Sequence, residues 1–302
     1  MADVAAGPVI RVEYRGRIAI ITIHNPKKLG ALTASDYYDL ATRMNEVAKH
    51  DEVFVTVLLG TGRFFSAGAD VTLARPSPSD GNSSNSSSSS SNEDAQRQSQ
   101  HKLWLSAFVA NNLNITYAFA HHPKILVVGL NGPVVGLSAA LVGWADFIYC
   151  TPHAFLLTPF SALGLVAEGG SSRALVNRLG LARANEALIM SKRLDATALK
   201  QCGFVNEIFD FDDDGGGGGG GERGGHENQF RERVLDEVRE RLGEHLHGES
   251  LLGIKKLIRR PEVEISNAQS VHEVFAGLDK FVRGIPQEEF RKLASGEKRH
   301  KL

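Results

Sequence analysis

Cysteine is scarce in this sequence, which has only Cys150 and Cys202 among its 302 residues. Two cysteines in largely apolar or helical surroundings do not predict a disulfide-stapled fold, and a reducing compartment is the natural expectation. An excess of charge is also lacking, because 34 Lys and Arg oppose 35 Asp and Glu, for a formal net charge of -1. We therefore expect no nucleic-acid or membrane-surface partner recruited by the overall field of the protein.

Long apolar runs are absent too. No run approaches the roughly 20 residues of a transmembrane helix. Residues 1–4 lack the basic start and apolar stretch of a secretory signal, so export is not expected. At the other end, Lys301-Leu302 resembles the end of the tripeptide read by the peroxisomal import receptor, with His300 replacing the usual small residue. This predicts a peroxisomal protein; the alternative is a frayed basic terminus and a cytosolic location.

The sequence does have enough apolar residues, 42% of the total, to bury a large core. Short apolar runs bounded by Gly, Pro or Asp predict buried strands. In the run 17–23 both sets of alternate residues are largely apolar, so both faces of this strand should be buried, and Arg15-Gly16 before it predicts a hairpin. The predicted strands span residues 11–14, 17–23, 54–59, 125–129, 147–150 and 154–157.

Helices are predicted between these strands. Thr33, followed by an acid at Asp36, is typical of a capping box and predicts an amphipathic helix that runs to about Lys49. The alternation of strands and helices predicts an α/β fold with buried strands. Further helices are expected at about 101–120, 137–144, 170–179, 182–190 and 195–201.

Two low-complexity stretches divide the chain. A Ser-rich run predicts a mobile insert at 76–100. The Gly run within 211–227 lacks the G-x-x-x-x-G-K-[ST] pattern of a phosphate-binding loop and is interpreted as a linker. It separates a core, 1–210, from a helical C-terminal segment, 228–302, which should pack on that core or on a neighbouring subunit.

Glu168 is a lone carboxylate in an otherwise apolar and Gly-rich stretch, Gly164 to Ser171. A carboxylate among Leu, Val and Ala loses hydration, so its pKa is expected to rise toward the range useful for proton transfer at neutral pH. This predicts a general acid/base. The alternative is a residue in the first turn of the helix beginning near Gly169, where its charge favours the helix N-terminus.

The stretches 64–70, 131–140 and 164–171 share one arrangement, since each is expected to follow a strand and precede a helix. The first backbone N–H groups of such a helix lack internal partners and can point at an oxygen that gains negative charge. Two such turns facing each other would form an oxyanion hole. The alternative is a set of ordinary tight turns between strands and helices.

In this order, the three stretches resemble the crotonase superfamily, which contains the enoyl-CoA hydratases and isomerases. The resemblance covers roughly residues 9–210, and 25–32 is similar to the family's first CoA-contacting loop. It implies a spiral of ββα repeats. It also implies that the C-terminal helical segment mediates formation of trimers, sometimes paired into hexamers.

The resemblance also implies site residues. In the family two backbone amides hold the thioester carbonyl, and these carry over to Ala69 and Leu137. Lys27 is placed near the CoA phosphates, although it could equally be a solvated surface lysine. A loop that grips the CoA adenine through its backbone carries over to Ala67, Gly68, Ala69, Asp70 and Val71.

Departures from the family pattern reduce the number of activities that the resemblance implies. The two carboxylates of the hydratases are replaced here by Ala140 and Phe160, which leaves Glu168 alone. A single acid at that position resembles the fungal-type peroxisomal Δ3,Δ2-enoyl-CoA isomerases. We expect Phe160, with Leu165 and Val166, to form a dry wall beside the substrate. The alternatives are dienoyl-CoA isomerisation, hydration, or a non-catalytic scaffold that binds acyl-CoA.

No cofactor is expected beyond the coenzyme A carried by the substrate. The pair His121-His122 lacks a third ligand at metal-binding spacing and is interpreted as a helix C-terminal pair. Gly136 to Ala140 lacks the final Gly of a nucleophile elbow, so a serine hydrolase is not predicted.

Overall fold

The structure is a computed structural model that describes residues 7–70, 90–211 and 223–299. Most of the predicted Ser-rich insert, the Gly run, Val71 and the last three residues lie outside the described residues. Among the described helices, none combines the length and apolar character of a membrane span.

The main sheet begins with the predicted hairpin and is otherwise parallel. Strand β1 (Ile10–Arg15) pairs antiparallel with β2 (Ile18–Ile23), and β2 pairs in parallel with β3 (Val55–Gly60). The strand order is β1-β2-β3-β4-β6-β9. The remaining three strands are β4 (Ile125–Leu130), β6 (Phe147–Cys150) and β9 (Glu207–Ile208), all added in parallel.

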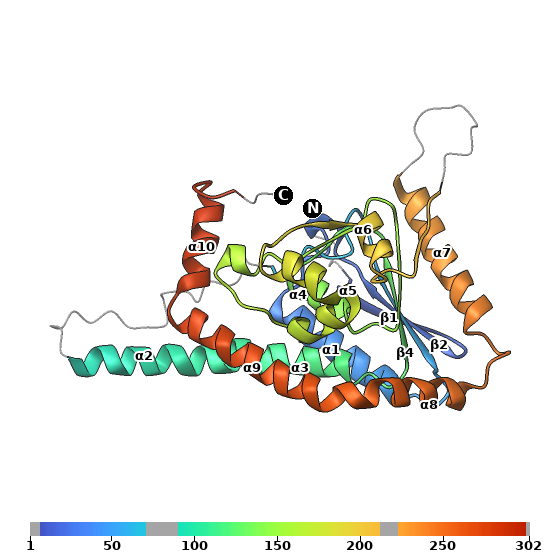
Figure 1. Ribbon diagram of the computed structural model, residues 1–302, viewed down its shortest axis with the longest axis horizontal. Coiled ribbons are helices and arrows are strands. Elements are labelled where there is room, and N and C mark those ends of the chain that lie inside the picture. The colour runs from blue at the N-terminus through green and yellow to red at the C-terminus, as the bar shows by residue number, and fades with distance from the viewer. Residues whose placement is uncertain (1–6, 71–89, 212–222, 300–302) are drawn as a thin grey trace.

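Helices cover both faces of this sheet (Figure 1). Ile21 and Ile23 of β2 pack in the larger core, under helices of the N-terminal part. Ile18 and Ile20 point the other way and pack against α7 (Arg223–Arg241). The prediction that β2 is buried on both faces is confirmed, and so is the predicted α/β fold. The helices of the larger core are α1 (Ala34–Ala48), α3 (Asn111–Ala120), α4 (Gly136–Val142) and α5 (Ser171–Leu188).

Local sequence signals correctly predict the start of α1 and the interruption of α5. Thr33 accepts a hydrogen bond from the N–H of Asp36, whose carboxylate accepts the N–H of Thr33, so the capping box is confirmed. The predicted break between 179 and 182 is a kink within α5 at Gly180, which has φ 73°. A second, small sheet and the short α6 complete this part: β5 (Val134–Val135), β7 (Phe155–Leu157), β8 (Leu194–Asp195) and α6 (Ala196–Gln201).

The helix expected to start at 101 instead starts at Ser90, as α2 (Ser90–Trp104). The last residues of the predicted insert, 90–100, are therefore helical. The reason is tertiary packing, because Trp104 stacks on Phe281 with ring centroids 4.5 Å apart and anchors the end of the helix. Once a turn is held in place, adding further turns costs little. A π-helical turn, η4 (Leu105–Ala110), joins α2 to α3.

The C-terminal segment lies against the core, as Figure 1 shows. Helix α9 (Val263–Val282) contacts α2, α3, η4 and α5. Helix α7 begins at Arg223, inside the stretch interpreted as a linker, and closes the second face of the sheet. The segment therefore completes the core in addition to any contact it makes with other subunits. Its other helices are α8 (Gly248–Arg259), η6 (Arg260–Glu262) and α10 (Ile285–Ala294).

Candidate active site

Glu168 lies in a tight loop between η5 (Ser161–Leu163) and α5. The next two residues, Gly169 and Gly170, have φ angles of 69° and 73°, which favour glycine. A Cβ atom on Gly170 would lie 2.4 Å from the ring of Trp144. Trp144 also donates a hydrogen bond of 2.9 Å from Nε1 to the carbonyl of Gly169. The loop is thus locked against α4, and this fixes the position of Glu168.

The loop delivers Glu168 to a cavity of about 390 Å³. Ala69 and Leu137 line the same cavity, so the fold brings the three predicted catalytic residues together. The apolar part of the wall includes Ala107 and Phe108 of η4, Phe281 of α9 and Phe290 of α10, the last two of which belong to the C-terminal segment. The other lining residues are Leu32, Ala34, Tyr37, Asp70, Leu103, Trp104, Asn111, Asn112, Ile115 and Leu165.

The surroundings of Glu168 raise its pKa into the range that proton transfer at neutral pH requires. Burial raises its pKa from the ordinary value of 4.5 to about 8, and the nearby carboxylate of Glu273 adds to the rise. A hydrogen bond from Asn112 opposes this rise. Desolvation dominates, as the apolar sequence around Glu168 predicted.

Asn112 is a site residue that the sequence analysis missed. Its side-chain N–H donates to Oε2 of Glu168 at 2.9 Å, and its carbonyl oxygen accepts the N–H of Gly169 at 3.3 Å. Asn112 lies in α3, inside a stretch expected only to be helical. A buried asparagine on an apolar helix face, here 4% exposed, was the one available signal.

The two predicted oxyanion loops lie directly against each other. Gly68 has φ 88°, and a Cβ atom there would lie 2.8 Å from the carbonyl oxygen of Val135. The N–H of Val135 donates to the carbonyl of Ser66 at 2.9 Å, which ties the loops together. Among the described residues, the N–H groups of Ala69 and Leu137 donate no backbone or side-chain hydrogen bond. Both remain available to an oxygen in the cavity.

A chain of buried hydroxyl groups supports these loops from behind. Ser66 donates to the carbonyl of Gly30 at 2.8 Å, so its oxygen can accept from Ser138, 2.8 Å away. Ser138 in turn lies 2.9 Å from the hydroxyl of Tyr37. Because Ser66 precedes Ala69 and Ser138 follows Leu137, these hydroxyl groups link the two predicted oxyanion loops. Sequence reasoning did not identify these hydroxyl groups.

The remaining predicted binding residues fall into two groups. Ala67 and Asp70 belong to the loop beside the cavity, whereas Lys27 is exposed in η1 (Pro26–Lys28). The neighbouring Lys28 forms the ion pair with Asp70, at 2.8 Å. Phe160 is 2% exposed and is not among the described residues that line the cavity, so its proposed contact with substrate stays a prediction.

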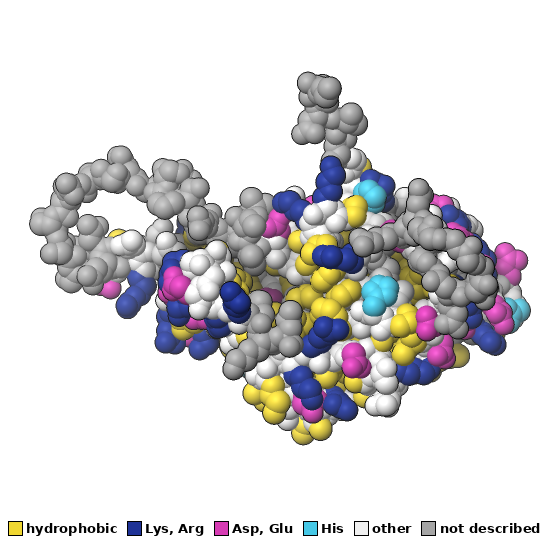
Figure 2. Space-filling view, turned by 90° about the horizontal axis from the view of Figure 1, so that it is seen from above, with side chains coloured by type: hydrophobic (Ala, Val, Ile, Leu, Met, Phe, Trp, Pro, Cys, Tyr) yellow, Lys and Arg dark blue, Asp and Glu magenta, His cyan; other side chains and the backbone are white. Residues whose placement is uncertain are grey.

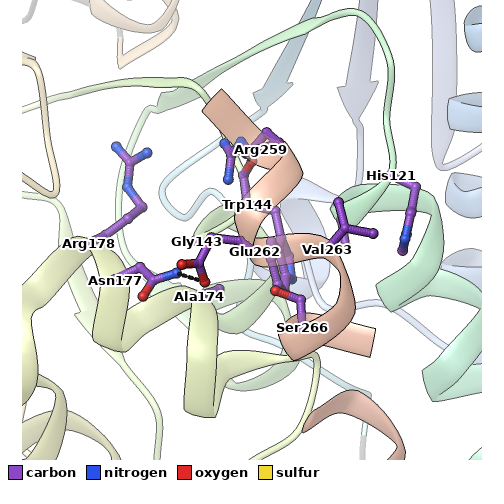
Figure 3. Close-up of a pocket in the computed structure, with 11 residues that line it drawn as sticks. His121, Gly143, Trp144, Ala174, Asn177, Arg178, Arg259, Glu262, Val263 and Ser266 are labelled. Carbon is purple, nitrogen blue, oxygen red and sulfur yellow. Dashed lines mark hydrogen bonds between the residues drawn. The ribbon is translucent and has the colours of Figure 1, made fainter. Parts of the chain in front are cut away.

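A second, much smaller cavity, of about 40 Å³, lies where the C-terminal segment meets α5 (Figure 3). There Glu262 accepts two hydrogen bonds from Arg173, at 2.7 and 2.8 Å, and one from Asn177 at 3.1 Å. Arg259 donates to the carbonyls of Trp144 and Ala145. These contacts hold the C-terminal segment on the core. Among the described residues, they bring no candidate catalytic group into this cavity.

Comparison with known proteins agrees with this geometry. The model of the enoyl-CoA hydratase/isomerase family matches residues 13–213. A Δ(3,5)-Δ(2,4)-dienoyl-CoA isomerase of Pyricularia oryzae is 58% identical over 97% of this chain and 99% of its own length. A 3,2-trans-enoyl-CoA isomerase of Saccharomyces cerevisiae is 33% identical over 97% of both. The crystal structure of an enoyl-CoA hydratase/isomerase from Pseudoalteromonas atlantica has the same fold, with a TM-score of 0.75, 21% identity and coverage of 97% of this chain and 100% of that one. The chain belongs to the enoyl-CoA hydratase/isomerase family.

Proposed function

We propose that this protein is an enoyl-CoA isomerase that converts a 3-enoyl-CoA into the trans-2-enoyl-CoA. One observation carries the proposal: Glu168, with its raised pKa, shares a largely apolar cavity with the free N–H groups of Ala69 and Leu137. A base and an oxyanion hole in one dry cavity are the two requirements for removing a proton next to a thioester carbonyl.

The reaction needs no group beyond these. The carboxylate of Glu168 removes a proton from C2, and the electron pair moves into the thioester, whose oxygen becomes a dienolate held by the two N–H groups. The protonated Glu168 then returns the same proton to C4, and the double bond ends between C2 and C3. Removing one donor of such a hole typically costs about 100- to 1000-fold in rate.

The wall of the cavity favours isomerisation over hydration. Leu165, Phe108 and Phe281 line the cavity together with Glu168 and would disfavour water there, and the positions that match the two hydratase carboxylates hold Ala140 and Phe160. A water molecule would have no second carboxylate to orient it.

A second candidate is the conversion of a 3,5-dienoyl-CoA to the 2,4-dienoyl-CoA. The observation in its favour is the 58% identity to the Pyricularia oryzae protein of that name. This reaction returns the proton to C6 rather than C4. The same cavity is lined by Tyr37 and Asp70 in addition to Glu168, which supports a test of both substrates.

Coenzyme A would be held at the mouth of the cavity. The loop Ala67 to Asp70 and the exposed lysines of η1 support this placement, with Lys28 fixed by its ion pair to Asp70. Figure 2 shows Lys and Arg side chains beside an apolar area on one face, an arrangement suited to phosphates next to an acyl chain.

Import into peroxisomes through the last three residues is also proposed. A fluorescent protein fused in front of the full chain should enter peroxisomes, and removal of residues 300–302 should leave it in the cytosol. Unchanged localisation of the truncated fusion would contradict this signal.

The test of the activity compares wild type with Glu168→Gln on trans-3-hexenoyl-CoA and on 3,5-octadienoyl-CoA, with product identification. Wild type should convert the first to the conjugated trans-2-enoyl-CoA, and the variant should lose at least about 1000-fold in kcat. Faster conversion of the dienoyl substrate would favour the second candidate. A 3-hydroxyacyl product would support a hydratase, and binding without turnover a scaffold.

A further inference from the structure

The N-terminus of α5 could have stabilised the negative charge of Glu168 and so made it a weaker base. A helix leaves its first N–H groups without internal partners, and these groups, with the helix dipole, stabilise nearby anions. Glu168 lies just before Gly170, the N-cap of α5. A carboxylate in direct contact with this helix end would be held as a weakly basic anion, which is the alternative interpretation of Glu168 in the sequence analysis.

The structure gives every one of these N–H groups another acceptor. The N–H of Gly169 donates to the side chain of Asn112 at 3.3 Å, and that of Ser171 donates to the backbone carbonyl of Glu168 at 3.1 Å. Glu273, from the distant helix α9, accepts the other two: Gly170 N–H on Oε2 and Ser172 N–H on Oε1, both at 2.7 Å. The side chain of Glu168 receives none of the four.

We propose that Glu273 is a positioning residue of the active site: its carboxylate occupies the N-terminus of α5 and prevents this helix end from stabilising the anion of Glu168. The inference rests on the proposed function, because it explains how Glu168 stays basic enough to remove a proton from C2. It assigns to the C-terminal segment a role in tuning the base.

The charges around Glu168 agree with this role. Among the described residues near it, each cation has another partner: Arg173 on α5 pairs with Glu262, and Lys28 pairs with Asp70 across the cavity mouth. On α1, Tyr37 contributes a neutral hydroxyl group that lies 2.9 Å from Ser138. α3 contributes the neutral amide of Asn112, α4 has no charged side chain, and His272 beside Glu273 is exposed. Glu273 is therefore the charged group that acts most directly on Glu168.

Burial raises the pKa of Glu273 as well, and the two N–H groups of α5 oppose that rise. Because the charge of Glu273 raises the pKa of Glu168, the two carboxylates titrate as a coupled pair. Glu273 has two backbone donors and Glu168 has one amide donor, so the first proton goes to Glu168. The carboxylate that stays charged is the one that caps the helix, and its charge makes the other the stronger base.

The test is the pH dependence of kcat/KM for wild type and Glu273→Gln. The acid limb of this profile is the pH range in which kcat/KM falls because Glu168 becomes protonated. The variant loses the negative charge and frees one N–H of α5, so the acid limb should move to lower pH by about one unit. Above the limb the variant should be slower, because its base is weaker. The ratio of variant to wild-type activity should therefore fall as the pH rises. A purely structural defect would lower activity by one factor at every pH.

Glu262→Gln is the matched control. Glu262 also joins the C-terminal segment to α5, through the side chain of Arg173, but it accepts no backbone N–H at the start of the helix. This variant should leave the acid limb where wild type has it. Glu273→Asp keeps the charge and should keep the limb closer to the wild-type position than Glu273→Gln does.

A second measurement does not depend on turnover. In protein labelled with ¹³C at glutamate Cδ, the signal that disappears in Glu168→Gln reports Glu168, and its titration should move to lower pH in Glu273→Gln. In Glu168→Gln the Glu273 titration should stay close to its wild-type position, because Glu168 is already protonated and neutral at the pH where Glu273 titrates. Glu273→Ala also removes the negative charge and tests the idea if Glu273→Gln fails to fold. A Glu168 titration that does not move in folded Glu273→Gln or folded Glu273→Ala would overturn the inference. A shifted titration in a protein that converts no enoyl-CoA would instead overturn the proposed function alone.

Discussion

The side-chain amide of Asn112 holds Glu168 by both of its ends, donating to Oε2 at 2.9 Å and accepting the N–H of the next residue, Gly169, at 3.3 Å. This arrangement fixes the direction of the carboxylate relative to its own backbone. It also adjusts basicity in the direction opposite to Glu273, since the amide donor stabilises the anion of Glu168 and Glu273 destabilises it.

Replacement of Asn112 by Ala should therefore raise the pKa of Glu168. The acid limb of kcat/KM should move to higher pH, and activity at pH 7 should fall about 10-fold. Asn111→Ala is the matched control, because the amide of Asn111 donates to the carbonyl of Ala107 instead. It should leave the position of the limb unchanged. A limb that moves to lower pH in Asn112→Ala would contradict the assigned role of the amide.

The free energy of unfolding should depend on pH because Glu168 is buried. Its pKa is about 8 in the folded protein and near 4.5 when unfolded, so the folded state binds the extra proton between these values. The free energy of unfolding should then fall as the pH rises from about 4.5 to about 8. Glu168→Gln lacks this titration and should be more stable than wild type by roughly 2 kcal/mol at pH 8.5, with little difference near pH 4.5. Urea unfolding at several pH values measures this gap, and a gap that does not grow with pH would show that Glu168 titrates normally.

Substitution of Gly68 tests the contact between the predicted oxyanion loops. Gly68→Ala adds a Cβ atom 2.8 Å from the carbonyl of Val135, and should separate the loops and lower kcat about 100-fold. Gly16→Ala, in the β1–β2 turn, is a control with a similar positive φ, 56°, but nothing lies within 4 Å of the added atom. Both variants should lose about 1 kcal/mol through backbone strain, measured by thermal unfolding. Equal kinetic losses in the two would argue against the assigned oxyanion hole.

The C-terminal segment also presents a surface that a second copy would cover. On α8, the side chains of Ile254, Leu257 and Ile258 are 57%, 68% and 69% exposed. Contiguous exposed apolar residues of this kind mark interaction sites, and the predicted trimer would bury them. Leu257→Glu combined with Ile258→Glu should reduce the assembly to monomers in sedimentation velocity, whereas Lys256→Glu on the same helix should not. A wild type that sediments as a monomer would refute the predicted assembly.

Local patterns in the sequence were enough for the longer strands, for several helix starts and for the candidate base, whereas the two-residue strands β5, β8 and β9 were not predicted. The double alternation of residues 17–23 required a strand with two buried faces, and the Thr33–Asp36 box set the start of α1. Glu168 could be identified because its neighbours along the chain, mostly apolar or Gly, are also its neighbours in space. Burial is the largest cause of its raised pKa, as that local pattern predicted.

The partners of Glu168 were decided by tertiary structure alone. Asn112 is 56 residues before Glu168, and Glu273 is 103 residues after Gly170, whose N–H it accepts. Neither lies in a local pattern that reveals its role, because α3 and α9 meet the start of α5 only when the core packs. The sequence by itself determined that a buried carboxylate stands before a helix; the packing of two distant helices decided which groups share the donors at that helix end, and hence how strong a base the carboxylate is.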